Sequence, residues 1–196
     1  MKTIPSILTF ASLAATSHAA IIYSGVRDIL IPTTFIGVYL DVDVGDTVAE
    51  EGAGWDINPF FGGEGVANSP SFEPVRMTVD VGSPVLNLAF GQTVSAAGTY
   101  ATGYAGSDSH MGGGASQFAS GNDGYIGFKL TANGNDGPYF GWMRLQLSNT
   151  GSTGLIRDWA YDNTGGSITV GAVPEPSAAA LALLLGSAAV CFRRRQ

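Results

Sequence analysis

The chain has 196 residues, of which nine are basic and sixteen acidic, and its formal net charge of −7 disfavours binding to nucleic acid or anionic lipid. It contains one cysteine, Cys191, which lies in an apolar C-terminal run, so an intramolecular disulfide bond and thiol catalysis are excluded. Its two histidines, His18 and His110, are too few for a multi-histidine zinc site, and only His110 could serve in a Ser-His-Asp triad, because His18 lies in a predicted leader.

Residues 1–19 have the pattern of a secretory signal peptide. A positively charged start and an apolar stretch at residues 4–15 precede small residues at Ser17 and Ala19. This pattern predicts a signal helix that is cut between Ala19 and Ala20 by signal peptidase, after export by the secretion machinery. The apolar stretch is too short for a membrane-spanning helix.

Residues 20–172 are predicted to form one domain, because their number allows a sizeable core but not two separate ones. They include five basic and fifteen acidic residues, so this part of the chain carries a net charge of −10. Such a charge is typical of a soluble exported surface, and it excludes nucleic acid as a partner.

The composition predicts an all-β fold for this domain. Glycine accounts for 28 of the 196 residues, about twice the usual share of roughly 7 per cent, without a collagen-like period. Long helical periodicity is absent between the two ends of the chain. We therefore expect a single antiparallel β-sandwich, jelly-roll-like, of roughly eight to ten strands, with helix confined to the N-terminal signal and the C-terminal segment. No cofactor is expected.

Residues 35–44 alternate between apolar and polar side chains, which predicts a half-buried strand. The face predicted to point inward consists of Ile36, Val38, Leu40, Val42 and Val44.

Asp41, Asp43 and Asp46 resemble the beginning of a calcium-binding loop, but the pattern fails. Gly45 occupies the fifth position, where a ligand is expected, and no glutamate closes the loop at the twelfth. We expect solvated carboxylates on the outer face of a strand, and no metal site.

Trp55, Asp56 and Asn58 are candidate glycan-binding residues, since an aromatic ring beside polar oxygens suits the C–H groups and hydroxyls of a sugar. The alternative is a strand whose Trp55 and Ile57 point inward. The alternative is favoured, because large aromatic side chains mostly supply core area.

The middle of the domain is less regular. Further strands are predicted at residues 71–81 and 84–90. Residues 91–123 are expected to form a long loop or a weak strand with a loop, because glycine, serine, alanine and threonine dominate them.

Three strands and two turns are predicted near the C-terminal end of the domain. Residues 125–132 and 139–148 form a hairpin with a turn at residues 133–138, and a second turn at 149–153 leads into a strand at 155–162. A short strand at residues 167–170 is predicted to close the domain.

The faces and register of these strands can also be predicted. Ile126, Phe128 and Leu130 share one face of the first strand. A register centred on Gly151 pairs opposite charges on one face and places an aromatic ring over a glycine on the other. The predicted pairs are Arg144 with Asp158, Met143 with Trp159, and Gly141 with Tyr161.

Residues 173–196 form a tail of three parts. Residues 173–177 contain the motif Pro174, Glu175 and Pro176, residues 178–192 are uncharged and apolar, and residues 193–196 include Arg193, Arg194 and Arg195. As a helix, residues 178–192 span roughly 22 Å, which is short of a bilayer core of about 30 Å. The flanks favour a membrane helix, because the prolines end any element upstream and the arginines suit the cytoplasmic side.

This ordered combination resembles the PEP-CTERM sorting signal of Gram-negative bacteria. The resemblance implies that an exosortase, an integral-membrane enzyme, recognises Pro174, Glu175 and Pro176 and releases the protein to the surface. The alternative is an uncleaved tail anchor. Residues 54–59, 139–145 and 156–161 are also similar to uncharacterised β-rich exported PEP-CTERM proteins, for which the resemblance implies no catalytic residue.

The expected function is that of a non-catalytic cell-surface or extracellular-matrix protein that associates with exopolysaccharide. It would be exported across the inner membrane, anchored transiently by its C-terminal helix, and then released to the surface. The alternatives are a carbohydrate-binding domain and, less favoured, a glycan hydrolase. A hydrolase would need a carboxylate pair from Glu50, Glu51, Asp56, Glu64 and Glu73.

Overall fold

The structure, a computed structural model, describes residues 21–48, 50–52, 54–80, 83–101, 105–109, 117–118, 121–133, 136–148 and 151–174. The predicted signal helix and the predicted membrane helix at residues 178–192 lie outside these residues, as does His110. In the part of the chain that is described, no helix has the length and hydrophobicity needed to cross a bilayer.

The described residues form an all-β fold of antiparallel strands, which confirms the predicted fold class. They include thirteen strands, more than the expected eight to ten, because several are only two or three residues long. The strands are β1 (Ile21–Tyr23), β2 (Ile29–Ile31), β3 (Tyr39–Asp41), β4 (Asp46–Val48), β5 (Ile57–Phe60), β6 (Gly65–Asn68), β7 (Phe72–Pro74), β8 (Thr93–Val94), β9 (Ala105–Ser109), β10 (Asp123–Ala132), β11 (Asp136–Gln146), β12 (Gly154–Asp162) and β13 (Ile168–Thr169), with one 3-10 turn, η1 (Phe61–Gly63).

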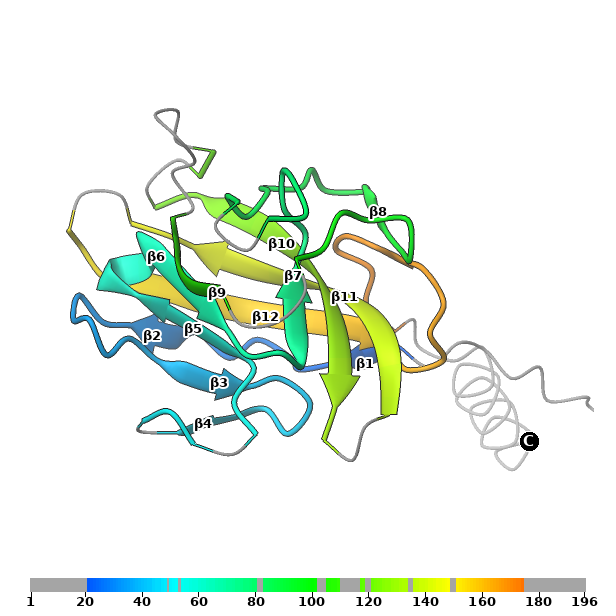
Figure 1. The fold of residues 1–196 in the computed structure, drawn as a ribbon, viewed down its shortest axis with the longest axis horizontal. Coiled ribbons are helices and arrows are strands. Elements are labelled where there is room, and N and C mark those ends of the chain that lie inside the picture. The colour runs from blue at the N-terminus through cyan, green and yellow to red at the C-terminus, as the bar shows by residue number, and fades with distance from the viewer. Residues whose placement is uncertain are drawn as a thin grey trace, which may run out of the picture.

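The strands form two main sheets (Figure 1). The large sheet has the order β1-β12-β11-β10-β7, and β2 also pairs with β12. The small sheet has the order β4-β3-β5-β6-β9, and β8 pairs with β13 separately. Consecutive strands β10, β11 and β12 are neighbours, so the longest strands of the described domain form a simple antiparallel meander.

One apolar cluster joins the two sheets. It combines Leu40, Ile57 and Val66 from the small sheet with Phe128 and other side chains from the inner face of the large sheet. Phe128 is fully buried and stacks on Phe72, with 4.7 Å between ring centroids. The core therefore lies between the sheets, where both bury their apolar faces.

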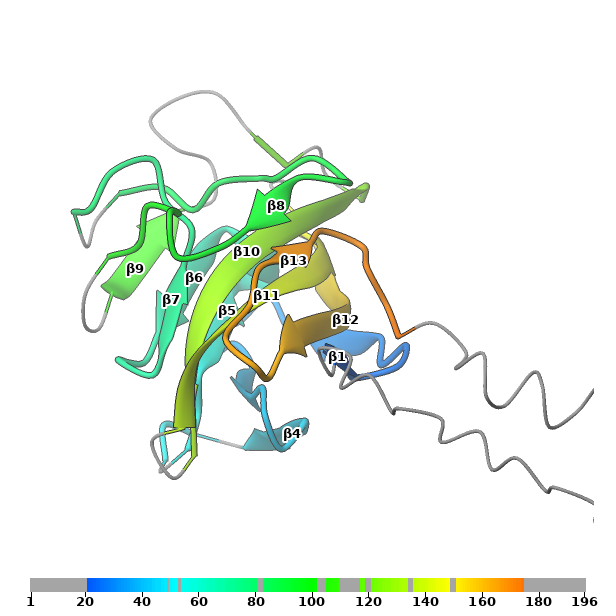
Figure 2. The same cartoon turned by 90° about the vertical axis from the view of Figure 1, so that its right-hand side faces the viewer.

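A second apolar cluster lies on the outer face of the large sheet, which is the face turned away from the small sheet. Phe140 and Trp142 pack there against Val94, Ile168 and Val170. Figure 2 shows β8 and β13 on this side of β10 and β11. These strands cover only part of the outer face.

The predicted register between β11 and β12 is confirmed. Gly141 faces Tyr161, Met143 faces Trp159, and Arg144 faces Asp158. The register shifts between Arg144 and Leu145, where Leu145 faces Ile156. Because of this β-bulge, the register centred on Gly151 holds only in the part of the hairpin far from the turn.

The hairpin of β10 and β11 is also confirmed, with a shorter turn than predicted, because β11 begins at Asp136 and includes Pro138. Ile126, Phe128 and Leu130 are all 0 % exposed, as their shared inner face requires.

The predicted strand at residues 35–44 is wrong at both ends. Only Tyr39–Asp41 form strand β3, and Ile36 and Val44 are 59 % and 60 % exposed. Gly37 and Gly45 adopt positive φ angles of 67° and 80°, which turn the chain away from the sheet.

Three other predicted segments differ in extent. The predicted strand at residues 71–81 is reduced to β7, and residues 84–90 contribute an isolated bridge between Val85 and Arg76 rather than a strand. Residues 91–123, expected to be a long loop or a weak strand with a loop, contain two short strands, β8 and β9. The closing strand at 167–170 is present as β13.

We expect Gly141→Ala to lower the free energy of unfolding by about 2 kcal/mol, because the added methyl group overpacks the core. A Cβ atom at Gly141 would lie 2.2 Å from the ring of Phe128 and 2.7 Å from the backbone oxygen of Ala160. Urea unfolding measures the change. Gly52→Ala is the matched control, because a Cβ atom there meets nothing closer than 3.7 Å; equal effects of the two substitutions would contradict this packing.

Candidate metal centre

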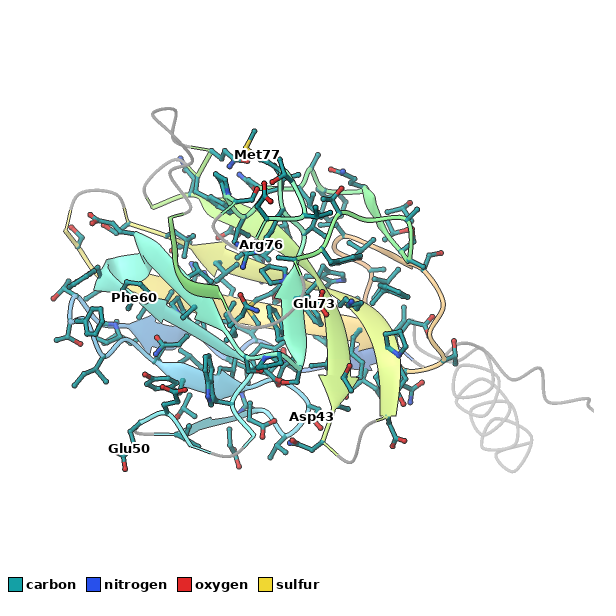
Figure 3. The ribbon with its side chains drawn as sticks, in the orientation of Figure 1. Asp43, Glu50, Phe60, Glu73, Arg76 and Met77 are labelled. Carbon is teal, nitrogen blue, oxygen red and sulfur yellow. The ribbon has the colours of Figure 1, made fainter. Side chains whose placement is uncertain are left out.

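Three aspartates meet at one end of the small sheet. Asp41 ends β3, Asp43 lies in the turn to β4, and Asp56 precedes β5. Pairing of Leu40 with Ile57 brings Asp41 beside Asp56, and one carboxylate oxygen from each aspartate lies within 4.8 Å of the others. Figure 3 shows Asp43 near the turn between β10 and β11.

Asp56 is the most enclosed of the three, with 3 % of its surface exposed. One of its carboxylate oxygens accepts a hydrogen bond of 2.8 Å from the amide of Val42, and the other accepts one of 2.6 Å from the hydroxyl of Ser71. These two donors hold the carboxylate in a single orientation.

Asn133, beside the β10–β11 turn, connects the large sheet to this group. Its side-chain amide donates to Asp41 at 2.9 Å and to Asp43 at 3.1 Å, and its backbone amide donates to Asp43 at 2.8 Å. Asp41 also accepts a hydrogen bond of 3.1 Å from the amide of Val44. We call Asp41, Asp43 and Asp56, with Asn133, the acidic centre.

The charges of the acidic centre have no basic counterpart among the described ion pairs. None of the salt bridges between described residues includes Asp41, Asp43 or Asp56. Burial raises the pKa of Asp56 to about 6. Burial, and next a hydrogen bond with Asp43, also raises the pKa of Asp41. The acidic centre is therefore stabilised either by a proton shared between its carboxylates or by a bound cation.

A divalent cation such as Ca²⁺ is the metal that suits these ligands, because it takes six to eight oxygen ligands in a flexible arrangement. Asp41, Asp43 and Asp56 could each supply one oxygen, and water could supply the others. The expectation of solvated outer-face carboxylates is wrong for Asp41, which is 8 % exposed. Asp46 is exposed and does not belong to the group.

An open cleft of about 470 Å³ borders the acidic centre. Asn133 belongs to both, and Ser71 connects them, since each lines the cleft and hydrogen-bonds to an aspartate. The cleft is lined by Gly52, Gly54, Trp55, Ser69, Pro70, Ser71, Thr131, Ala132 and Asn133.

The three candidate glycan-binding residues are buried. Trp55 is 6 % exposed and packs edge-on against Tyr39, with 5.2 Å between ring centroids. Asp56 and Asn58 are each 3 % exposed, and the amide of Asn58 donates to the backbone oxygen of Ile36 at 2.9 Å. Ile57 lies in the core between the sheets, whereas Trp55, which precedes β5, is buried in a separate cluster with Phe60 and Ala67. Trp55 therefore leaves little ring surface for a sugar.

The glutamates considered for a hydrolase lie in different surroundings. Glu50 and Glu51 are exposed, and Glu64 is partly exposed. Glu73 is 9 % exposed and pairs with Lys129 at 2.8 Å. The carboxylates that the structure groups with Asp56 are therefore aspartates rather than these glutamates.

The predicted sorting and cleavage residues fall mostly beyond the described part of the chain. Pro174 is described and exposed. The remaining residues of these predictions lie outside it, namely Ala19, Ala20, Glu175, Pro176, Arg193, Arg194 and Arg195.

We expect metal-free protein to lose stability as the pH rises from about 4 to about 7. The folded state keeps the proton of Asp56 up to a pKa of about 6, whereas the unfolded chain releases it near the ordinary value of 3.8. This difference stabilises the fold below the ordinary pKa, and the stabilisation, about 3 kcal/mol, is lost as the pH passes the folded value. Urea unfolding in a chelating buffer measures it. Asp56→Asn should flatten the pH dependence and exposed Asp46→Asn should not; an unchanged slope in Asp56→Asn would contradict the assignment.

We also expect calcium to stabilise the protein at neutral pH. A calcium concentration about tenfold above the Kd of the site raises the free energy of unfolding by about 1.4 kcal/mol. Thermal unfolding with calcium, compared with sodium at equal ionic strength, measures this. Asp43→Asn should abolish the effect and Asp46→Asn should retain it. Equal stabilisation of both variants would show general screening instead of binding.

Comparison of the chain with protein-family models, with curated proteins and with solved structures finds no match. No residue of the acidic centre therefore takes a role from a relative, and the case for each depends on its contacts and burial.

Proposed function

We propose that the chain is an exported, non-catalytic protein of the cell surface or extracellular matrix, associated with exopolysaccharide and sorted by an exosortase through its C-terminal tail. The ordered tail, with Pro174, Glu175 and Pro176 before an apolar run and Arg193, Arg194 and Arg195, is the feature that suggests sorting. The signal-like residues 1–19 suggest export.

The observation that carries the proposal is where the chain leaves the domain. The indole of Trp142 donates a hydrogen bond of 3.0 Å to the backbone oxygen of Ala172, and Val173 is 43 % exposed. The fold therefore holds the chain in place up to Ala172. Pro174, the first residue of the motif, is exposed. A recognising enzyme could bind the motif without unfolding the domain.

The two ends of the domain also lie together. Ile21, one residue beyond the predicted mature N-terminus, and Ala172 both pack against the outer apolar cluster. Figure 1 shows β1 on the same side as the end of the coloured chain, which the structure describes to residue 174, and Figure 3 places Phe60 on the opposite side. In this proposal the end near Phe60 points away from the membrane.

We infer that the two main sheets form a β-sandwich, and the apolar cluster shared between them supports this architecture. The jelly-roll-like connectivity stays a prediction. A sandwich without disulfide bonds suits an exported domain whose stability comes from its core.

The alternative function is carbohydrate binding. Burial of Trp55 disfavours the predicted glycan patch, although the neighbouring cleft offers hydroxyl and amide groups. The hydrolase alternative is weaker, because Asp56 has both oxygens engaged by Val42 and Ser71, and Glu73 is paired with Lys129.

We expect Glu175→Ala to leave the protein unprocessed in the inner membrane of its host, because the acidic residue between two prolines is the recognition element that a plain anchor does not need. Intact-mass spectrometry of surface-released protein measures processing. Glu50→Ala, which removes an exposed glutamate of the domain, is the matched control. A released species that still ends in Gln196 would contradict sorting, and so would normal processing of Glu175→Ala.

A further inference from the structure

Aromatic rings gather on the uncovered part of the outer face of the large sheet. The centroid of Trp142 is 6.1 Å from that of Tyr125 and 6.3 Å from that of Tyr23, and Phe90 lies 6.2 Å beyond Tyr125. Trp142 is 2 % exposed and Phe90 is 73 % exposed, while Tyr23 and Tyr125 are partly exposed. The ring contacts thus run in a row from Tyr23 through the buried Trp142 to Tyr125 and Phe90.

Strand register places charged side chains next to this row. Tyr125 faces Arg144 on the neighbouring strand, and Arg144 faces Asp158. Alternate residues of a strand share a face, so Arg144 lies on the same side of β11 as Trp142. We call Tyr23, Phe90 and Tyr125, with Arg144 and Asp158, the ring-lined face.

Hydrogen bonds hold the polar groups of this face in place. The guanidinium of Arg144 donates to both carboxylate oxygens of Asp158, at 2.9 and 2.6 Å, and the hydroxyl of Tyr23 donates to Asp158 at 2.9 Å. Gln146 donates to Asp123 at 3.0 Å at the border of the face. Asp158 itself is 3 % exposed, so a ligand would meet the prepositioned side chains of Arg144 and Tyr23, which have little side-chain entropy left to lose.

The charges on and around this face nearly cancel. Arg144 and Arg157 are each paired with aspartate, through Asp158, Asp123 and Asp28. The predicted exported part as a whole carries −10, so this region is much less acidic than the average surface. An uncharged ligand suits such a surface, whereas an anionic polymer would meet the exposed carboxylates of Asp28 and Asp123.

We propose that the ring-lined face binds an uncharged polysaccharide. The C–H faces of sugar rings pack on Phe90, Tyr125 and Tyr23, and sugar hydroxyls hydrogen-bond with Arg144, which the buried Asp158 holds in place. A row of rings on an open sheet face suits an extended chain. The inference deepens the proposed function, since export is what brings this face to a polysaccharide.

The test is depletion of the full-length chain, purified in detergent, from solution by insoluble cellulose, chitin or β-1,3-glucan, with alginate gel as the charged polymer. At least one uncharged polymer should bind the wild type. The double variant Phe90→Ala, Tyr125→Ala should bind about tenfold more weakly, because two stacking rings are lost. Phe35→Ala is the matched control, since Phe35 is 72 % exposed and lies beside Phe60, away from this face.

Several results would overturn the proposal: no binding to any uncharged polymer, binding to alginate alone, equal binding by wild type and double variant, or equal loss in Phe35→Ala. Tyr125→Leu, which keeps apolar bulk but removes the ring, must also weaken binding, so a folding defect of Tyr125→Ala cannot decide the outcome. A dimer that the double variant dissociates would assign the face to a second copy and overturn the proposal. Failed sorting is visible separately as an intact C-terminus, so the two failures are distinguishable.

Discussion

The apolar cluster between the two sheets is the constraint on which the rest of the domain depends, because a chain with a single cysteine cannot form an internal disulfide in its place. Its effect extends to the polar end of the small sheet. Trp159, in the core, donates a buried hydrogen bond of 2.9 Å to the backbone oxygen of Val42, whose amide donates to Asp56. The core therefore fixes the turn that carries Asp41 and Asp43. The acidic centre, although polar, is positioned by apolar packing a few ångströms away.

The C-terminal meander was readable from sequence, since several independent signals agreed there. Opposite charges at Arg144 and Asp158, and a glycine opposite Tyr161, specify one register, and a slip by one residue would move every side chain to the wrong face. The bulge beyond Arg144 could not be predicted, because the alternation of apolar and polar residues does not show where a strand accommodates an extra residue. Thus local alternation predicted which strands pair, and tertiary packing determined where the pairing shifts.

The acidic centre was missed for a different reason. Asp56 lies beside Asp41 only because Leu40 pairs with Ile57, and the local sequence of neither segment predicts that contact. Alternation at residues 35–44 suggested that Asp41 points to solvent, yet it is buried beside Asp56, with Asn133 reaching it from the large sheet. The signal for this site in the sequence is the pair Asp41 and Asp43 followed by Asp56 after a glycine-rich turn, and only the strand register brings the three together.

The hydrogen bond from Trp142 to Ala172 also affects how the domain would respond to a pulling force on its C-terminal tail, if the tail attaches it to the membrane as proposed. A pull on the tail reaches Ala172 first and then β13, which pairs with β8 through only two residue pairs, Ile168 with Val94 and Thr169 with Thr93. Such a short pair would peel open at low force. The hydrogen bond from the indole of Trp142 transmits part of the force to β11, the middle strand of the meander. There the force is distributed over many backbone hydrogen bonds. Under the proposed attachment by the tail, tension would reach the domain at its large sheet, and β13 would act as a short extensible link in front of it.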